Sequence, residues 1–320
     1  MATQASAITF LSTPGQAFND GMGFIQFYFG LPFAMVVICL FFIPIYHRLK
    51  IYTAYEFLEN RFDKRVRTLT ASLFLMQRGL AAGITIYAPA IILSVVLNWD
   101  LRITALVVGS LVILYTLVGG TKAVNMTQKL QMFIIFFGMF LAFYFIITNF
   151  PNQISFLDAI SIAGKAEKLN FLDFSINLKS RYTFWSGITG GLFLSLSYFG
   201  TDQSQVQRYL SGRSIRESQM GLIMNGFLKV PMQFFILFTG VMVFVFYQFE
   251  SAPLNFNPKA ILTVKESKQT EEFSKLEIEN LETQKQIRNL LLNNGSSKEI
   301  DALRKKESKQ RDIARYIISK

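Results

Sequence analysis

The sequence contains few residues that bind metals or perform covalent catalysis. Among its 320 residues there is one cysteine, Cys39, and one histidine, His47. A single cysteine excludes an intrachain disulfide and a cysteine-based metal cluster. The motifs HExxH, CxxC and GxxxxGK[ST] do not occur, so zinc hydrolysis, dithiol redox chemistry and P-loop energy coupling have no residues to act through. We find no catalytic constellation and expect that the protein is not an enzyme.

Charge is also scarce within long stretches of the chain. About half of the residues are apolar, 33 are phenylalanine, and the formal net charge is +11. This composition lies outside the usual range of a soluble domain. The lysines and arginines cluster at the ends of apolar segments, as topology determinants of membrane proteins do, so we do not expect nucleic-acid binding.

The apolar residues form six long segments that are bounded by charges, and each is of a length suited to crossing roughly 30 Å of hydrocarbon as a helix. We predict a multi-pass, all-α membrane protein, with a short interfacial helix in 52–67 and a polar outer connection in 150–182 that holds a surface helix. The basic ends of the segments predict which loops are cytoplasmic. The six predicted spans are 24–46, 69–97, 103–118, 132–147, 184–201 and 222–249.

Both ends of the chain differ from these spans. The apolar stretch 5–11 is too short to cross a bilayer and is predicted to break at Ser12, Thr13, Pro14 and Gly15. With Gly21 outside, Met1 would lie near the middle of the membrane, where a free amino group is costly. We therefore expect the native protein to continue upstream, or the N-terminal arm to be interfacial or re-entrant.

The C-terminal segment alternates positive and negative residues, and its apolar positions recur at helical spacing. The run 293–297, Asn-Asn-Gly-Ser-Ser, interrupts this pattern. We predict two domains: a partial transmembrane domain over 1–262 and an extramembrane charged helical hairpin over 263–320. The hairpin is expected to be a spacer, with a partner-binding coiled coil as the alternative.

The predicted span 184–201 is unusually polar. Ser195, Tyr198 and Asp202 lie at positions i, i+3 and i+7, which places them along one face of a helix. Gly187 and Gly191 lie four residues apart, a spacing that allows close approach of helix backbones. A polar face inside a membrane is costly unless it meets water, a solute or a polar partner. Together with the broken first helix, this favours alternating-access transport of a small polar solute over a channel, which would need a filter sequence.

Four ordered stretches resemble the sodium:solute symporter family: 6–14 (SAITFLSTP), 52–62 (YTAYEFLENRF), 119–124 (GGTKAV) and 198–210 (YFGTDQ followed by VQRYL). The family contains sodium-coupled carriers of sugars, proline, sialic acid, monocarboxylates, vitamins and iodide. The resemblance implies a partial LeuT-like inverted-repeat bundle that comprises core helices one to seven. Helices eight to ten of the second repeat would follow Lys320.

The resemblance also implies sodium as the coupling ion. Ala2 and Ala5 match positions whose backbone carbonyls contribute half of a sodium site, and the other half would come from helix eight. Because a hard cation needs several oxygen ligands at once, the chain alone is not expected to couple sodium to transport. A transporter-like sensor or binding module without transport is the alternative function.

The resemblance assigns candidate solute contacts to Thr9, Tyr28, Ser195 and Tyr198. In sugar-transporting relatives the tyrosine that matches Tyr198 shields the solute from the cytoplasm. Hydroxyl groups at positions where sugar carriers use amides or carboxylates leave two solute classes open, a sugar and a small carboxylate or other anion.

A gate or ion path is expected at Thr127, Gln128, Asp202 and Gln203. Gln128 stands where the family commonly has an aspartate, and losing a charge about 4 Å from a cation forfeits roughly 4 kcal/mol at an effective dielectric near 20. We therefore predict one sodium ion per solute.

Three further charged residues lie in or beside the spans. Asp202 is expected to pair with Arg208 or to cap the end of its helix. Arg78 is expected to extend toward the membrane surface, with a functional ion pair as the alternative, and Lys229 is expected to extend to the surface as well. The lipid bilayer is the second expected partner, and a bacterial inner membrane is the expected location.

Overall fold

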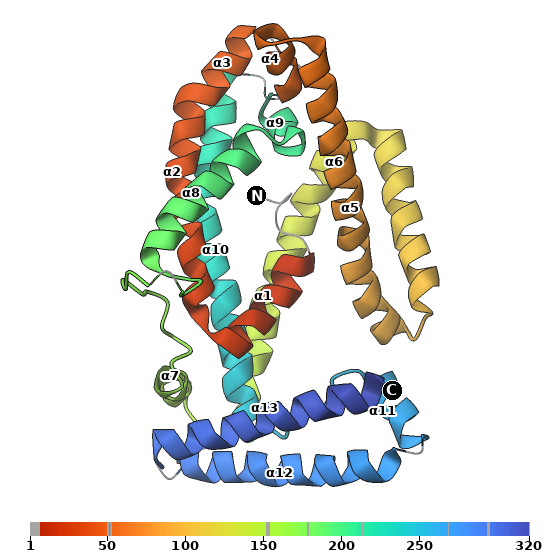
Figure 1. Cartoon of the computed structure of the whole chain (residues 1–320), viewed down its shortest axis with the longest axis vertical. Coiled ribbons are helices and arrows are strands. Elements are labelled where there is room, and N and C mark those ends of the chain that lie inside the picture. The colour runs from red at the N-terminus through yellow and green to blue at the C-terminus, as the bar shows by residue number, and fades with distance from the viewer. Residues whose placement is uncertain are drawn as a thin grey trace. The chain divides into compact units, whose positions relative to one another are not determined.

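The computed structural model describes residues 7–49, 51, 53–151, 154–177, 179–210, 212, 214–267, 269–292 and 295–319, and within these ranges it contains helices and no strands. Figure 1 shows the helices along the chain. Two compact units divide the chain: Met1–Ala88 with Leu169–Gly240, and Pro89–Lys168 with Val241–Lys320.

The first unit contains the N-terminal helices, two helices from the middle of the chain and parts of two longer helices. Its elements are α1 (Ala7–Asp20), η2 (Met22–Tyr28), α2 (Gly30–Val37), η3 (Ile38–Phe42), α3 (Ile43–Leu49), α4 (Ala54–Arg61), the first part of α5 (Lys64–Leu97), α8 (Phe184–Gly200), α9 (Gln203–Leu210) and the first part of α10 (Ile215–Phe249).

The second unit contains the remaining parts of α5 and α10 and the C-terminal helices. Its other elements are α6 (Leu101–Thr148), α7 (Phe156–Lys165), α11 (Pro258–Lys265), α12 (Thr270–Leu292) and α13 (Ser297–Ser319). Gly120 divides α6 into two helical parts, because its φ of 54° and ψ of −154° are not helical. This positive φ suits glycine, so the turn predicted at the glycine pair is confirmed.

Five helical stretches among the described residues are long and apolar enough to cross a membrane: Met22–Leu49, Lys64–Leu97, Leu101–Gly120, Ala123–Thr148 and Ile215–Phe249. Each contains one of the predicted spans. The sixth predicted span forms α8, which has 17 residues because the chain leaves the helix at Thr201.

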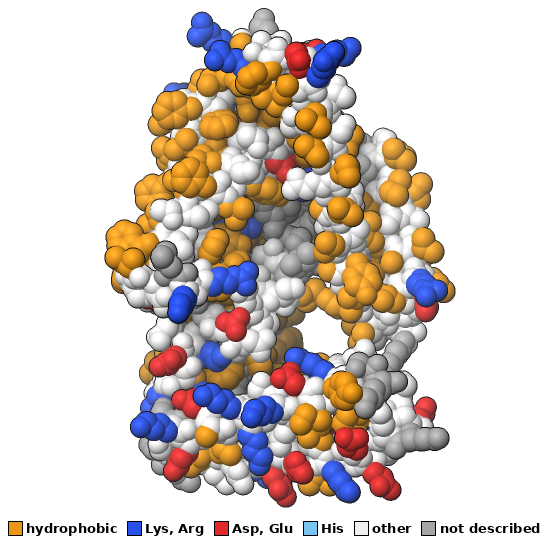
Figure 2. Space-filling model, viewed as in Figure 1, with side chains coloured by type: hydrophobic (Ala, Val, Ile, Leu, Met, Phe, Trp, Pro, Cys, Tyr) orange, Lys and Arg blue, Asp and Glu red, His pale blue; other side chains and the backbone are white. Residues whose placement is uncertain are grey.

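Many large apolar side chains on these helices are exposed, including Leu75, Val118 and Phe133, and Figure 2 shows hydrophobic side chains over much of the visible helical surface. In water such a surface would be strongly unfavourable, whereas in lipid it is the expected exterior. The chain is therefore an integral, multi-pass membrane protein.

One expectation about the N-terminal region is wrong. The break predicted at residues 12–15 does not occur, because α1 continues through Pro14 to Asp20. A proline removes one backbone hydrogen bond and distorts a helix without always ending it. The helix ends instead before Gly21, whose φ is 81°.

Close backbone contact joins α8 to the consecutive helices η2 and α2. A Cβ atom added at Gly187 would meet the backbone of Gln26, and one added at Gly191 would meet the backbone of Phe27. On the opposite helix, a Cβ at Gly30 would meet the backbone of α8. The small-residue packing predicted from the glycine spacing is therefore confirmed.

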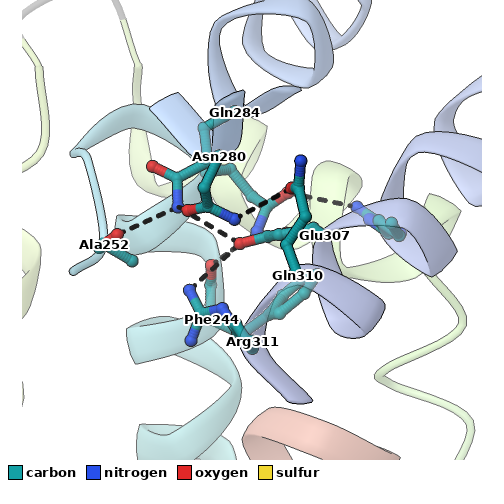
Figure 3. A network of polar contacts seen from close by, with 9 residues as sticks. Phe244, Ala252, Asn280, Gln284, Glu307, Gln310 and Arg311 are labelled. Atoms are coloured by element: carbon teal, nitrogen blue, oxygen red, sulfur yellow. Dashed lines mark hydrogen bonds and ion pairs between the residues drawn. The ribbon is translucent and has the colours of Figure 1, made fainter. Parts of the chain in front are cut away.

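The C-terminal segment is helical, as predicted, and α12 and α13 run antiparallel on either side of residues 293–296 (Figure 1). A small apolar core holds α11, α12 and α13 together, with Leu254 from the segment that follows α10. A second layer is polar, and it includes the buried side chains of Asn280, Gln284 and Gln310 (Figure 3). The domain boundary at residue 262 and an extramembrane position stay predictions.

Candidate functional site

The break between α8 and α9 is the centre of the candidate site. Helix α8 begins with a capping box formed by Thr183 and Ser186 and ends at Gly200. Thr201 then takes φ −126° and ψ −21°, and α9 starts two residues later. Oδ1 of Asp202 accepts hydrogen bonds from the Ser204 backbone N–H at 2.9 Å and from its hydroxyl at 2.7 Å. Asp202 therefore caps the start of α9, whereas the sequence predicted a cap at the end of the preceding helix.

Two other helices form hydrogen bonds to the residues on either side of the break. The hydroxyl of Tyr46 on α3 donates to the carbonyl oxygen of Gly200 at 2.7 Å. The backbone N–H of Ala54 at the start of α4 donates to Oε1 of Gln203 at 2.9 Å. Both bonds are buried, and each gives a partner to a polar group that would be costly to leave unpaired.

Asp202 also forms an ion pair with Arg78 on α5. The side chains are 31% and 12% exposed, respectively. The guanidinium carbon of Arg78 lies 5.9 Å from the ring centre of Phe74 and 5.7 Å from that of Tyr198. Arg78 thus forms an ion pair, the alternative expected for it, and does not extend to the membrane surface, because a carboxylate and two aromatic rings provide a local environment for its charge. Asp202 pairs with Arg78, at a sequence separation of 124 residues, where the sequence predicted Arg208.

A cavity of about 490 Å³ lies beside this ion pair. Ser197, Tyr198, Thr201 and Asp202 supply polar groups to its wall, and α5 adds Gln77 and Phe74. The rest of the wall is mostly apolar and aromatic, and it comes from Phe42, Tyr46, Ala54, Tyr55, Phe57, Leu58, Thr70, Leu73 and Leu194. A largely apolar cavity with a few polar groups is typical of small-molecule sites.

Of the four predicted solute contacts, Tyr198 lines this cavity and accepts a hydrogen bond from Nε2 of Gln205 at 3.0 Å. Ser195 is partly buried on α8 and does not belong to the cavity wall within the described chain. Thr9 is partly buried on α1, and Tyr28 ends η2 beside Phe24. The predicted stripe of Ser195, Tyr198 and Asp202 thus contributes its last two members to the cavity, where Ser197 and Thr201 join them.

A second polar group, missed in the sequence, lies on α10, and one of its members faces Tyr28. Asn225, Lys229 and Gln233 recur every four residues on α10 and are 5%, 3% and 0% exposed. The ammonium nitrogen of Lys229 lies 5.9 Å from the ring centre of Tyr28. The surface position predicted for Lys229 is wrong, because the side chain turns into the packed interior. The spacing i, i+4, i+8 within an apolar span was the available signal.

Several polar atoms of this α10 stripe have no hydrogen-bond partner among the described residues: both side-chain polar atoms of Gln233 and Oδ1 of Asn225. The ion pairs of the described chain do not include Lys229. Buried polar groups are normally hydrogen-bonded, and exceptions often mark places where a ligand or ion binds.

The remaining predicted site residues lie elsewhere. Ala2 and Ala5 fall outside the described residues. Thr127 and Gln128 belong to α6 in the second unit, and the Thr127 hydroxyl donates to the carbonyl oxygen of Val124 at 3.0 Å. Their roles in a gate or ion path stay predictions, as do those of Asp202 and Gln203.

Comparisons with known proteins match most of the chain. The family model described as "Sodium:solute symporter family" matches residues 1–276. The human sodium/iodide cotransporter is 32% identical over 253 residues, which are 77% of this chain and 38% of that protein. Sodium-coupled monocarboxylate transporter 1 of Xenopus laevis is 35% identical over 224 residues, or 70% of this chain and 36% of that protein.

A solved structure agrees with the sequence relatives. The chain resembles a Na⁺-coupled sialic acid symporter in a substrate-bound, outward-open state, with a TM-score of 0.67 and 31% identity over 77% of this chain and 51% of that one. The fold is therefore the LeuT-like fold of that symporter. The chain spans 38% or less of the length of the two curated relatives. From the family match and these similarities, the chain belongs to the sodium:solute symporter family.

Proposed function

We propose that the chain forms part of a carrier that couples sodium to the symport of a small polar solute by alternating access. The observation that carries this proposal is the break between α8 and α9, which is held by α3, α4 and α5 and borders a cavity of about 490 Å³. Interrupted helices beside a cavity expose backbone and side-chain polar groups to solute and ion, which continuous membrane helices cannot do. The relatives named above carry sodium in their names, and sodium is the proposed coupling ion.

The solute contacts proposed for this carrier are Tyr198, Tyr28, Thr9 and Ser195. The buried α10 stripe supports placing a solute near Tyr28, because Lys229 brings an ammonium donor to the ring of Tyr28 and the side-chain amide of Gln233 has no hydrogen-bond partner among the described residues. Donors of this kind suit a sugar hydroxyl or a small carboxylate, so both solute classes stay open. The named relatives include carriers of iodide, monocarboxylates and sialic acid.

The other proposed parts follow the family. Backbone carbonyls of Ala2 and Ala5 would contribute to sodium binding, and Thr127, Gln128, Asp202 and Gln203 to a gate or ion path. The transmembrane domain would cover residues 1–262, and residues 263–320 would lie outside the membrane. The mechanism requires no covalent step, so the proposed protein is not an enzyme. A bacterial inner membrane is the proposed location, although the two curated relatives named above are animal proteins.

The test combines solute binding with uptake. The purified chain in lipid nanodiscs is mixed with radiolabelled glucose, lactate, sialic acid or iodide in sodium or in potassium buffer, and uptake is measured in cells that produce the natural gene product. We expect one solute to bind and to enter the cells in a sodium-dependent manner. Binding without uptake would favour the sensor alternative, and the absence of both across the panel would refute the proposal.

A further inference from the structure

We propose that Arg78 is a positioning residue that latches α5 to the break between α8 and α9 and holds Tyr198 in the wall of the 490 Å³ cavity. This inference rests on the proposed carrier function, in which the break is a moving part. Arg78 contacts both Asp202, at the break, and Tyr198, so a movement of Arg78 would release both residues together.

The geometry gives Arg78 three simultaneous contacts. Its Nη2 pairs with Oδ2 of Asp202, and its guanidinium group lies within 6 Å of the ring centres of Phe74 and Tyr198. The other carboxylate oxygen of Asp202 is already used by Ser204 at the start of α9. The carboxylate therefore connects α5 directly to the first turn of α9.

An arginine is suited to this position in a way that lysine is not. A planar guanidinium can stack on aromatic rings while its N–H groups bind a carboxylate, whereas an ammonium group is a point charge with strong hydration. Phe74 lies one turn before Arg78 on α5, so this ring and the charge move as one unit. Tyr198 comes from α8, and its position thus depends on a charge carried by another helix.

The ion pair also lies at the break, so a movement of the break would change the distance between its two charges. Gly200 and Gln203, on either side of it, are fixed by neutral hydrogen bonds to α3 and α4. The contact to α5 is the charged one, and its two side chains are mostly shielded from water. Separating them would leave two partly buried charges without partners, a state that a closed conformation avoids and that a hydrated, open conformation tolerates.

The test measures access to the cavity. A cysteine is introduced at Ala54, which lines the cavity and is 6% exposed, in the chain reconstituted in nanodiscs, and its reaction rate with a water-soluble maleimide is followed. The natural Cys39 is 4% exposed and is replaced by alanine to remove background. A cysteine placed at the exposed Gln286 in α12, in a separate sample, gives the reference labelling rate of an accessible site.

We expect Arg78→Gln and Asp202→Asn each to raise the labelling rate at position 54 about tenfold, which corresponds to a loss of roughly 1.4 kcal/mol of preference for the closed state. The charge-swapped double variant, Arg78→Asp with Asp202→Arg, should recover at least part of the slow rate. Arg78→Lys should label at an intermediate rate, because it keeps the charge and loses the stacking.

A matched control lies on the same helix. Arg67 on α5 also forms an ion pair, with Glu59, but this pair is more exposed and neither residue lines the cavity. Arg67→Gln should leave labelling at position 54 unchanged. Labelling at position 286 and the thermal midpoint of unfolding should be similar in all variants, which excludes general loosening of the fold.

Equal rates in Arg78→Gln and the parent, or an equal increase in Arg67→Gln, would overturn the latch. The labelling needs neither sodium nor solute, so its outcome is separate from that of the proposed function. Slow labelling that depends on Arg78, in a chain to which no solute binds, would leave the latch in place and refute the carrier. Sodium-dependent solute binding with unchanged labelling in Arg78→Gln would support the carrier and refute the latch.

Discussion

The ammonium group of Lys229 faces the ring of Tyr28 at 5.9 Å, inside a helix that is long and apolar enough to cross the membrane. Lys229 is 3% exposed and lies between Asn225 and Gln233 on the same face of α10. A charge buried this deeply is costly to the fold, so its presence favours a role in binding.

Replacing this charge should separate stability from binding. In Lys229→Met we expect the thermal midpoint of unfolding to stay the same or to rise, because an ammonium group no longer has to be buried. Solute affinity should fall at least about tenfold, or roughly 1.4 kcal/mol, by equilibrium binding to the purified chain. Lys179→Met, at an exposed position, is the control and should change neither quantity. Unchanged affinity in Lys229→Met would exclude Lys229 from the solute site.

Two neighbouring glycines on α8 should differ sharply in their tolerance of a methyl group. Gly191→Ala places a Cβ against the backbone of Phe27, so α8 must move and the free energy of unfolding should fall by about 1–3 kcal/mol. Gly190→Ala meets no atom within 4 Å and should be neutral or stabilise by about 0.5–1 kcal/mol through helix propensity. Thermal unfolding of the two variants in the same detergent compares them, and equal midpoints would contradict the close packing.

The polar layer of the C-terminal helix pair should behave as a coupled unit. The side-chain amide of Asn280 donates to Oε1 of Gln310 at 3.2 Å, and Nε2 of Gln284 donates to Oδ1 of Asn280 at 2.8 Å (Figure 3). Asn280→Leu and Gln310→Met should each destabilise the pair by about 1–3 kcal/mol, because a buried polar partner is left unpaired.

The double variant of Asn280 and Gln310 should cost less than the sum of the single variants, because both partners of one hydrogen bond are then absent. Hydrogen exchange of the α12 and α13 amides measures these local stabilities, with the exposed Gln286→Met as the control. Strict additivity would show that the two side chains are not coupled.

Acid should weaken the start of α7. The hydroxyl and backbone N–H of Ser155 donate to the Asp158 carboxylate at 2.7 and 3.0 Å, and these bonds lower the pKa of Asp158 below its ordinary value of 3.8. A carboxyl whose pKa is lower in the folded state stabilises the fold above its unfolded pKa, and this contribution is lost as the pH falls through the folded pKa.

Hydrogen exchange at the start of α7, corrected for intrinsic rates, should therefore show lower protection at pH 3 than at pH 5. Asp158→Asn should lose most of this difference because it has no proton to gain in this range. An equal pH response in the variant and the parent would mean that another group is responsible.

The success of the span predictions and the failure of the charge predictions have a common physical origin. Apolar runs of sufficient length specify membrane helices locally, so the five spans could be identified without knowledge of packing. The turn at Gly120 and the close contacts of Gly187 and Gly191 follow from backbone sterics, which are also local. The sequence pattern around Pro14 was misleading, because a proline only removes one hydrogen bond and the rest of the helix can compensate.

What the sequence determined by itself is the solvent of the protein, the order of its helices and its family, because each depends on residues that are near one another in the chain. The partners of Arg78, Lys229 and Gln203 were decided by tertiary structure. A long, flexible side chain in a membrane helix can reach the surface or turn inward, and which of these has the lower free energy depends on groups contributed by other helices. Asp202 is 124 residues from Arg78, and no spacing rule connects them.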